Sequence, residues 1–373
     1  MPDTLLFAET QYFLAIFNKT KYSDRIGLML RNNGNHYRLS IYSNYQLSIT
    51  HNQTYFFSEK KNYMRGQVTQ STGSWYTIFT TDGQIIKART KGKLRLQNLN
   101  TTNPIAVGDW VLCEPEKTTD NWLITDIEQR TNYIIRPSPH SRRQKHIIAA
   151  NIDQLLVIVT FSMPRTPTGF IDRIAVNAEM YHVPVVLVFN KQDLYDDDDQ
   201  QSFEMARMVY GDCGYKVLLT SANTRYGLDE LKTVMSNKNS LVSGLSGVGK
   251  TSLLNALYPT LDLPVNEISD YSGKGQHTTT FATMYQLPFG GQLIDTPGIK
   301  TFGMTDLEMD EVAHFFPDLR KYIGQCRFNN CLHRNEPDCA VRNALEQHYI
   351  AEWRYNNYLN ILADIESVNY WER

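Results

Sequence analysis

The stretch VVLVFNKQDL, residues 185–194, places an apolar run directly before the tetrapeptide NKQD. That tetrapeptide has the form Asn-Lys-x-Asp, which is typical of segments that read guanine in GTPases. A carboxylate at Asp193 can accept hydrogen bonds from the N1–H and the 2-amino group of guanine, whereas adenine offers neither donor in that arrangement. NKQD alone is also a common turn sequence, so its weight depends on the motifs around it.

A second stretch, GLSGVGKTS at residues 244–252, fits the phosphate-loop pattern G-x-x-x-x-G-K-[ST]. Its glycines let the backbone wrap closely around phosphate, so that N–H groups point inward. Lys250 would reach the β- and γ-phosphates, and the Thr251 hydroxyl would bind Mg²⁺. SLVS before the loop predicts a strand and SLLNALY after it predicts an amphipathic helix, a context that favours a nucleotide site over a plain glycine-rich turn.

Three shorter signals agree with these two. DTPG, residues 295–298, follows the short strand QLI, and an Asp at a strand end is well placed to hold Mg²⁺ through water. GKGQHTTT, residues 273–280, offers hydroxyls for the same ion, of which Thr279 is the expected ligand. LLTSAN, residues 218–223, supplies small residues beside the guanine carbonyl. Each motif ends a predicted strand, where ligand contacts gather in doubly wound sheets.

These motifs define a predicted nucleotide site. The predicted GTP-binding residues are Asn190, Lys191, Asp193, Ser221, Ala222, Gly244, Ser246, Gly247, Val248, Gly249, Lys250, Thr251, Ser252 and Gly298. The predicted magnesium ligands are Thr251, Thr279 and Asp295. The base-reading motif precedes the phosphate loop, which reverses the usual order and indicates a circular permutation. Such a change is tolerated because domain termini often lie close together.

The motifs strongly resemble those of the circularly permuted ribosome small-subunit biogenesis GTPases, the RsgA family. The matching stretches are AANIDQLLVIVT (149–160), FIDR (170–173), VFNKQD (188–193), LTSAN (219–223), SGLSGVGKTSLLNAL (243–257), YSGKGQHTTT (271–280), LIDTPGIKTFG (293–303) and CRFNNCLHRNEPDC (326–339). The resemblance spans about Met64 to the C-terminus. It implies an all-β OB-fold barrel, a permuted α/β P-loop GTPase and a mainly helical zinc domain. It also implies GTP hydrolysis stimulated by the small (30S) ribosomal subunit during late maturation, with GTP, GDP and 16S rRNA as partners.

Four segments are therefore expected. They are an extension of unknown role at 1–63, an OB-fold RNA-binding domain at 64–140, the GTPase at 141–302 and a zinc-binding helical domain at 303–373. The extension shows no motif, although its composition permits strands, and Met64 is expected to be the natural start. Short β-rich runs separated by glycine-containing turns from Met64 onward independently predict a five-stranded barrel.

One barrel stretch, KARTKGKLR, predicts an RNA-binding strand. Its five alternating cations share one face of an extended chain, namely Lys87, Arg89, Lys91, Lys93 and Arg95. An ordinary solvated face is the alternative, but like charges repel one another and RNA phosphate is the natural counter-charge. A second basic patch, SRRQKH at 141–146, is either another contact or a linker.

The spacing Cys326-x4-Cys331-x-His333-x5-Cys339 predicts a closed Cys₃His zinc site. The alternative is three buried cysteines and an unrelated histidine, but the polar residues between them offer little to bury them in. No ligand position remains for a catalytic water, so the zinc is expected to be structural. A helical run is predicted from about 340 to 365, with its aromatic residues in the core.

Composition limits the remaining possibilities. The chain has 373 residues, 42% of them apolar, and a net charge of −2, so any basic surface must be local. Its apolar runs are too short to cross a bilayer, and its N-terminus lacks the pattern of a secretory signal. A cytoplasmic monomer without membrane contact is expected, with the clustered cysteines reduced and available to metal.

The segment after DTPG departs from the usual GTPase pattern for the catalytic step. The residue after the DTPG glycine is Ile299, where many GTPases use a Gln to orient water. The family resemblance implies His277 as the catalytic residue, whereas a surface histidine in a loop is the alternative. Two other functions fit the phosphate loop: a nucleotide-dependent docking module whose hydrolysis is only a reset, and an ATP-dependent small-molecule kinase. Asp193 argues against the kinase.

Overall fold

The computed structural model describes residues 28–33, 36–41, 45–49, 55–59, 63–90, 104–116, 119–138, 141–261, 282–295 and 307–371. The chain divides into two compact units, Met1–Tyr63 and Met64–Arg373. In the first unit, four strands form an antiparallel sheet in the order β1-β2-β3-β4. These strands are β1 (Leu28–Asn33), β2 (His36–Ile41), β3 (Tyr45–Ile49) and β4 (Tyr55–Glu59). The predicted four-part division of the chain stays a prediction.

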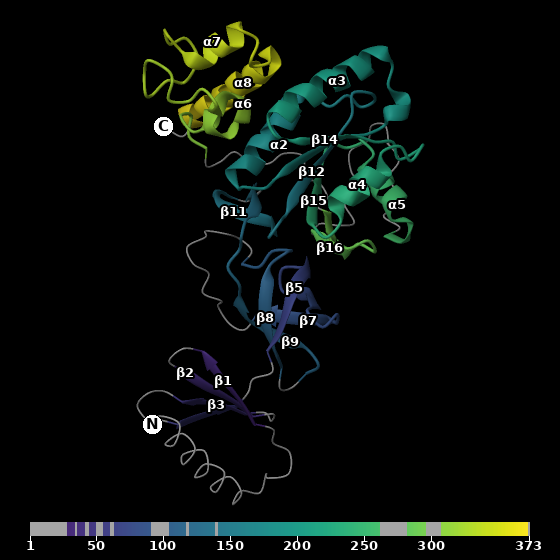
Figure 1. Ribbon diagram of the computed structural model, residues 1–373, viewed down its shortest axis with the longest axis vertical. Coiled ribbons are helices and arrows are strands. Elements are labelled where there is room, and N and C mark those ends of the chain that lie inside the picture. Colours follow the sequence, from purple (N-terminus) through teal and green to yellow (C-terminus); the bar gives the residue numbers. More distant parts are fainter. Residues whose placement is uncertain are drawn as a thin grey trace, which may run out of the picture. The chain divides into compact units, whose positions relative to one another are not determined.

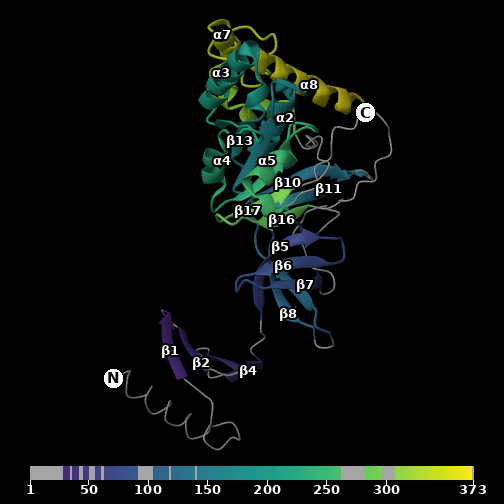
Figure 2. The same cartoon turned by 90° about the vertical axis from the view of Figure 1, so that its right-hand side faces the viewer.

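The centre of the second unit is a twisted sheet in which the order of strands is β14-β13-β12-β15-β17-β16 (Figures 1 and 2). All neighbouring pairs are parallel except β16, which runs antiparallel to β17. The strands are β12 (Gln154–Val159), β13 (Val185–Phe189), β14 (Lys216–Leu219), β15 (Asn239–Ser243), β16 (Thr283–Gln286) and β17 (Gln292–Asp295). The predicted strands before NKQD, TSAN, the phosphate loop and DTPG are confirmed.

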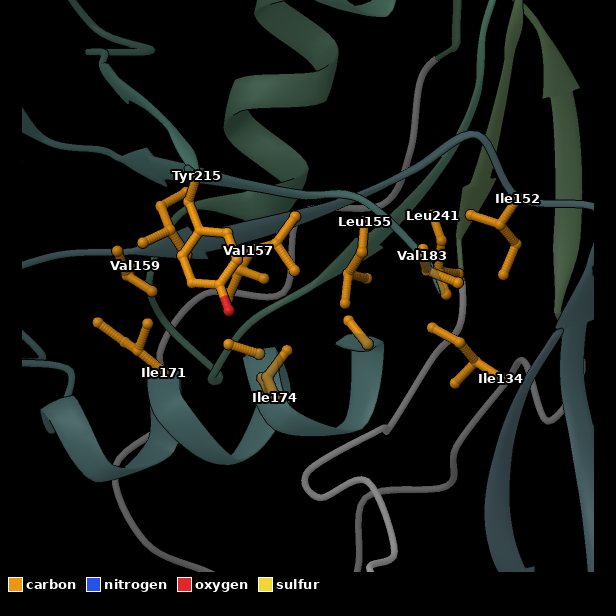
Figure 3. Packing of buried hydrophobic residues seen from close by; sticks show 14 of the residues in the cluster. Ile134, Ile152, Leu155, Val157, Val159, Ile171, Ile174, Val183, Tyr215 and Leu241 are labelled. Atoms are coloured by element: carbon orange, nitrogen blue, oxygen red, sulfur yellow. The ribbon is translucent and has the colours of Figure 1, made fainter. Parts of the chain in front are cut away.

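Helices cover both faces of this sheet because its strands are apolar on both sides. They are α2 (Thr168–Met180), α3 (Asp197–Asp212), α4 (Leu228–Met235) and α5 (Lys250–Leu257), with short 3₁₀ turns η2 (Gln192–Leu194) and η3 (Pro259–Leu261). Along β12 the buried side chains alternate between two cores. Leu155 and Val157 pack with Ile171 and Ile174 of α2 (Figure 3), whereas Leu156 packs toward α4 and α5.

Five strands precede the central sheet and close into a small barrel of OB type. They are β5 (Met64–Ser71), β6 (Tyr76–Thr80), β7 (Ile85–Thr90), β8 (Trp110–Pro115) and β9 (Trp122–Ile127). Their order is β5-β6-β7-β9-β8, and pairing of β5 with β8 closes the barrel. All five predicted strands are confirmed. The basic stretch SRRQKH is part of a strand and not a simple linker, since β11 (Ser141–Ala150) pairs with β10 (Tyr133–Ser138).

The C-terminal part is mainly helical, as predicted. It contains η4 (Val312–Phe315), α6 (Pro317–Arg320), α7 (Ala340–Glu346) and α8 (Glu352–Trp371). The expected single helical run from 340 to 365 is wrong in one respect, because it breaks between α7 and α8. His348 adopts a left-handed backbone with φ of 61°, which an α-helix does not continue through. Tyr355 and Tyr358 lie in the core of this part, as expected for its aromatic residues.

Among the described residues, no helix combines the length and the hydropathy that a membrane span requires. The longest described helix, α8, has 20 residues and is rich in polar side chains. Its first turn packs against the central sheet's domain, where Trp353 contacts the same core as α2 and α3.

Candidate nucleotide site and metal centre

Four parallel strands end at one edge of the central sheet. Because β13, β14, β15 and β17 are parallel, their carboxyl ends lie together, and NKQD, TSAN, the phosphate loop and Asp295 gather there. Along the chain, the base-reading motif comes first, the phosphate loop second and DTPG third. The strands that carry these motifs are nevertheless neighbours in a parallel sheet, as in a doubly wound nucleotide-binding fold. The permuted order that the sequence predicts is therefore accommodated without breaking the sheet.

The phosphate loop fits closely against its neighbours at two glycines. Gly244 has φ of 149°, and a Cβ there would lie 2.3 Å from the Ile158 carbonyl oxygen. Gly249 has φ of 89°, and a Cβ there would lie 2.6 Å from Nδ2 of Asn190. Any larger residue would push the loop away from the sheet, so both glycines are required for its path. The second contact also places the phosphate loop directly beside the base-reading motif.

Lys250 stands at the start of α5 with its ammonium folded back over the loop. Its Nζ donates to the carbonyl oxygens of Gly244 at 2.9 Å and Leu245 at 2.7 Å. Burial lowers the pKa of Lys250, while the nearby carboxylate of Asp295 acts in the opposite direction. The side chain is therefore a cation held inside the concave loop, where an anionic ligand can replace the two carbonyl groups as its partner.

Asn190 ties the base-reading motif to the phosphate loop and to β14. It is buried, its Nδ2 donates to the Val248 carbonyl oxygen at 3.0 Å, and its Oδ1 accepts from the Thr220 hydroxyl at 3.3 Å. These contacts use both ends of the amide. Asn190 thus links three loops that follow strands, and this structural role accounts for an Asn at its predicted place in the site.

Asp193 is exposed, and its carboxylate is oriented by two neighbours. Oδ1 accepts from the Ser221 hydroxyl at 2.5 Å, and Oδ2 accepts from Asn223 at 3.1 Å. The Ser221 hydrogen bond lowers the pKa of Asp193 below its usual range, and Asn223 adds to the effect. The group is therefore an anion with free lone pairs facing solvent, able to accept from two adjacent donors of a planar base.

Lys191 has a left-handed backbone, with φ of 64°, and its side chain crosses the site. Its Nζ donates to the Met163 carbonyl oxygen at 2.6 Å, and its Cε lies close to Gly249. Burial lowers the pKa of Lys191, against the charge of Asp193. The end of the aliphatic stem consequently lies beside the phosphate loop.

The remaining predicted residues fall on the same loops or outside the described part of the chain. Val248 is buried under the loop, and Ser246 and Ser252 are exposed on it. The residues that lie partly exposed at this edge are Ala222, Gly247, Thr251 and Asp295. Three predicted residues lie outside the described residues, namely His277, Thr279 and Gly298. Thr251 is the second residue of α5 and Asp295 ends β17, so these two candidate magnesium ligands stand at the phosphate-loop end of the sheet.

The predicted metal ligands come together in the C-terminal part. The four ligand atoms of Cys326, Cys331, His333 and Cys339 all lie within 4.8 Å of one another. Sγ of Cys326 is 3.9 Å from Sγ of Cys339, and Nδ1 of His333 is 3.5 Å and 3.4 Å from these two sulfurs. Tetrahedral zinc, with Zn–S of about 2.3 Å and Zn–N of about 2.0 Å, needs sulfurs about 3.8 Å apart. The donor set and its spacing fit zinc.

The predicted RNA-binding strand is described only at its first two cations. Lys87 and Arg89 are exposed on β7, whereas Ile86 and Ala88, which alternate with them, are buried in the barrel, so the predicted alternation is present there. Arg89 is not a free cation, because it forms an ion pair with Glu116. Lys91, Lys93 and Arg95 lie outside the described residues.

Three features of the structure were not predicted as part of the site. Asn223 orients Asp193, and its position directly after Ser221 and Ala222 is the signal that points to it. The Met163 contact with Lys191 uses a backbone carbonyl, for which no residue type is required. A third, the buried Arg354 that joins α8 to α2, has no local pattern because its two acids are far away in sequence.

Comparison with known proteins identifies relatives of the whole second unit. The family models RsgA GTPase and RsgA N-terminal domain match residues 127–305 and 65–123. The chain is 48% identical to the small ribosomal subunit biogenesis GTPase RsgA of Phocaeicola vulgatus over 309 residues, which cover 82% of this chain and 99% of that one. The protein of the same name from Bacteroides fragilis is 46% identical over 309 residues, with the same coverage.

Solved structures agree with these matches. The crystal structure of YjeQ from Thermotoga maritima aligns with a TM-score of 0.67 at 36% identity, covering 81% of this chain and 98% of that one. The crystal structure of YloQ, described as a circularly permuted GTPase, aligns with a TM-score of 0.64 at 27% identity, covering 86% and 98%. By its motifs, its permuted sheet and these relatives, the chain belongs to the RsgA family of circularly permuted GTPases.

Proposed function

We propose that this protein is a GTP-hydrolysing assembly factor that binds the small (30S) ribosomal subunit and its 16S rRNA during late maturation. The observation that carries the nucleotide part is the exposed Asp193 carboxylate, held by Ser221 and Asn223 beside a glycine-shaped phosphate loop. The ribosomal part is supported by the relatives, which are named small ribosomal subunit biogenesis GTPases.

In this proposal each strand-end loop has one task. Asp193 accepts from N1–H and the 2-amino group of guanine, which excludes adenine because adenine would leave the carboxylate without donors. The stem of Lys191 lies along the base and sugar, and the loop from Gly244 to Ser252 surrounds the phosphates with backbone N–H groups. Lys250 exchanges its two carbonyl partners for phosphate oxygens, which neutralises charge without ordering a new side chain.

Two metals complete the proposal. Mg²⁺ would be held by Thr251 and Asp295 with the nucleotide, and it supplies charge neutralisation at the phosphates. Thr279 is the proposed switch ligand and Gly298 the proposed γ-phosphate contact. Zinc would be held by the Cys₃His set, with a structural role because all four tetrahedral positions belong to protein ligands.

Hydrolysis is proposed to depend on the ribosomal partner. The position that orients water in many GTPases is occupied by Ile299, which cannot hydrogen-bond, and His277 is the proposed catalytic residue. A subunit that positions His277 against the attacking water would then raise turnover strongly. The proposed RNA contact is the cationic face of β7, with Lys87 immediately available and Arg89 available after it leaves Glu116. The role places the protein in the cytoplasm.

A docking module whose hydrolysis is only a reset is the second candidate, and Ile299 favours it because it implies slow turnover without a partner. The deciding experiment measures GTP turnover of the purified chain alone and with purified small subunits, large subunits or free rRNA. The assembly role expects strong stimulation by small subunits and little by the other two. Binding of small subunits without any change in turnover would favour the docking module. If small subunits selectively affected neither binding nor turnover, both the assembly role and the docking role would be contradicted.

A further inference from the structure

Helix α8 presents two pairs of side chains at the i, i+3 spacing, each pair on its own side of the helix. Tyr355 donates to the His333 carbonyl oxygen at 2.6 Å, and Tyr358 donates to that of Leu332 at 2.7 Å, so one side holds the metal-ligand segment. Arg354 and Asn357 form the other pair and contact α2. A single rigid helix therefore joins the metal centre to the GTPase domain.

Asn357 holds the beginning of α2. Its Nδ2 lies 2.6 Å from Oδ2 of Asp172 and 3.2 Å from the Thr168 hydroxyl oxygen. Thr168 is the first residue of α2, and Asp172 is one turn further along. The backbone of Gly169 lies so close that a Cβ there would be 3.2 Å from Oδ1 of Asn357. The N-cap residue of α2 makes no side-chain hydrogen bond to the helix. Asn357, from a distant part of the chain, holds the start of α2 instead.

The loop at 160–167 leads directly into this helix start and also touches the base-reading segment. Thr160 and Thr166 close the loop on itself through two hydrogen bonds, of 2.8 Å and 3.1 Å. The Phe161 N–H donates to the Tyr195 hydroxyl at 3.2 Å, just beyond the NKQD motif. The Met163 carbonyl oxygen accepts from Nζ of Lys191 at 2.6 Å. A closed loop of this kind moves with the helix that follows it.

We propose that Asn357 is a positioning residue for Lys191, so that the C-terminal metal part sets the affinity of the site for purine nucleotides. Asn357 fixes the start of α2, α2 places the Met163 carbonyl, and that carbonyl anchors the lysine whose Cε lies close to Gly249 of the phosphate loop. The inference rests on the proposed nucleotide assignment. It adds a connection through side chains between the C-terminal part and the site, besides the polypeptide that continues from DTPG into the C-terminal part.

The test compares Asn357→Ala with Asn356→Ala in the full zinc-loaded chain. Asn356 is the neighbouring residue of α8, has the same chemistry and is exposed, so its loss controls for helix propensity. Binding of GDP and of IDP, which lacks the 2-amino group, is measured by titration calorimetry. Asn357→Ala should weaken both nucleotides equally, about 3- to 30-fold, the range found for changes along a contact chain. Asn356→Ala should leave both unchanged.

The ratio of the two affinities separates positioning from base reading. Because the Lys191 stem would contact any purine, the preference for GDP over IDP should not change in Asn357→Ala, and kcat at saturating GTP should be kept while KM rises. A purely structural role would lower the melting temperature without moving the nucleotide affinity of the folded protein. Affinities equal to those of Asn356→Ala would overturn the proposal.

Gly169→Ala provides a second approach that does not weaken the fold. Alanine suits a helix better than glycine, but its Cβ would push against Oδ1 of Asn357. The melting temperature should hold or rise while both nucleotides bind more weakly. Asp193→Asn tests the proposed base reading separately from the positioning by Asn357. If this variant still prefers GDP over IDP as the parent does, the base-reading assignment is wrong. If that selectivity is lost and Asn357→Ala still binds normally, the positioning proposal alone fails.

Discussion

The barrel and the C-terminal part join the GTPase domain in opposite ways. The barrel joins mainly through backbone: Gln70 of β5 pairs with Thr283 of β16, and the Ala150 N–H donates to the Val107 carbonyl oxygen at 2.9 Å. The C-terminal part joins through side chains, centred on Arg354, which is 1% exposed. Backbone pairing tolerates most substitutions, whereas a buried charge depends on each of its partners. The two junctions should therefore respond very differently to mutation.

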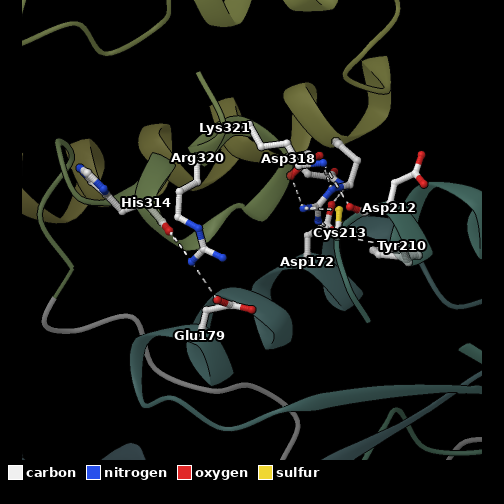
Figure 4. Close-up of polar contacts among 11 residues, drawn as sticks. Asp172, Glu179, Tyr210, Asp212, Cys213, His314, Asp318, Arg320 and Lys321 are labelled. Carbon is white, nitrogen blue, oxygen red and sulfur yellow. Dashed lines mark hydrogen bonds and ion pairs between the residues drawn. The ribbon is translucent and has the colours of Figure 1, made fainter. Parts of the chain in front are cut away.

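The C-terminal junction is a buried ionic network (Figure 4). Arg354 binds Asp172 at 2.5 Å and Asp318 at 2.6 Å, and its guanidinium lies 4.7 Å from the Phe316 ring centroid. The Tyr210 hydroxyl donates to Asp172 at 2.9 Å. Burial raises the pKa of Asp172, and the charge of Arg354 opposes that effect. One cation shared by two buried acids joins α8, α2 and α6 in a single arrangement.

Metal removal should have the largest effect and should affect only one junction. Binding of structural zinc contributes about 10 kcal/mol or more to folding of small metal domains. Cys331→Ser, or a strong chelator, should therefore unfold 307–371 and loosen α8 from α2, while the barrel stays folded. Hydrogen exchange of the two regions with and without metal measures this difference. Equal loss of protection in residues 64–90 would show that the two junctions are not independent.

Arg354→Met should have the next largest effect. It leaves Asp172 and Asp318 buried without their cation, which costs about 3–5 kcal/mol when one partner of a buried pair is removed. Arg320→Met is the matched control, because Arg320 pairs with Glu179 at the same junction but is about half exposed, and such pairs contribute about 0–1 kcal/mol. Denaturant unfolding of both variants gives the comparison. Similar losses in the two would contradict the buried-network account.

Gly108→Ala tests the barrel junction at its tightest point. Gly108 has φ of 94°, and a Cβ there would lie 2.0 Å from the Ala150 carbonyl oxygen. Gly73 has nearly the same φ of 86° but nothing within 4 Å, so Gly73→Ala carries only the left-handed backbone cost of about 1–2 kcal/mol. Thermal unfolding should show a clearly greater loss for Gly108→Ala. Equal losses would mean that the close backbone approach contributes nothing.

The smallest expected effect concerns the exposed barrel face. Lys87→Gln and Arg89→Gln should each change stability by less than about 0.5 kcal/mol, because both side chains are exposed. If the proposed RNA contact is correct, Lys87→Gln should reduce the salt slope of small-subunit binding by about 0.7–0.9. Arg89→Gln should reduce it less, because Arg89 must first leave Glu116. Filter binding across a salt series measures both slopes, and unchanged slopes would leave β7 as an ordinary solvated face.

Local patterns predicted the motifs of the proposed nucleotide site, because the chemistry of such a site is carried by short contiguous segments. The phosphate loop, NKQD and TSAN each require particular residue types at fixed spacing, and each follows a strand that the apolar pattern also predicts. The barrel strands were predicted in a similar way, from short β-rich runs separated by glycine-containing turns. The break between α7 and α8 was missed because the left-handed residue is His348, which has no glycine-like signal.

The sequence by itself determined which residues are proposed to touch a ligand or a metal: Asp193, Lys250 and the Cys₃His set all belong to segments shorter than fifteen residues. Only the tertiary structure decided how the flanking parts attach. Arg354 and Asp172 are 182 residues apart, Gly108 meets Ala150 through its backbone, and Lys191 is anchored by the carbonyl of Met163. The physical reason is that a ligand requires particular side chains at close spacing. A junction between domains can use backbone atoms and distant charges that leave no pattern along the chain.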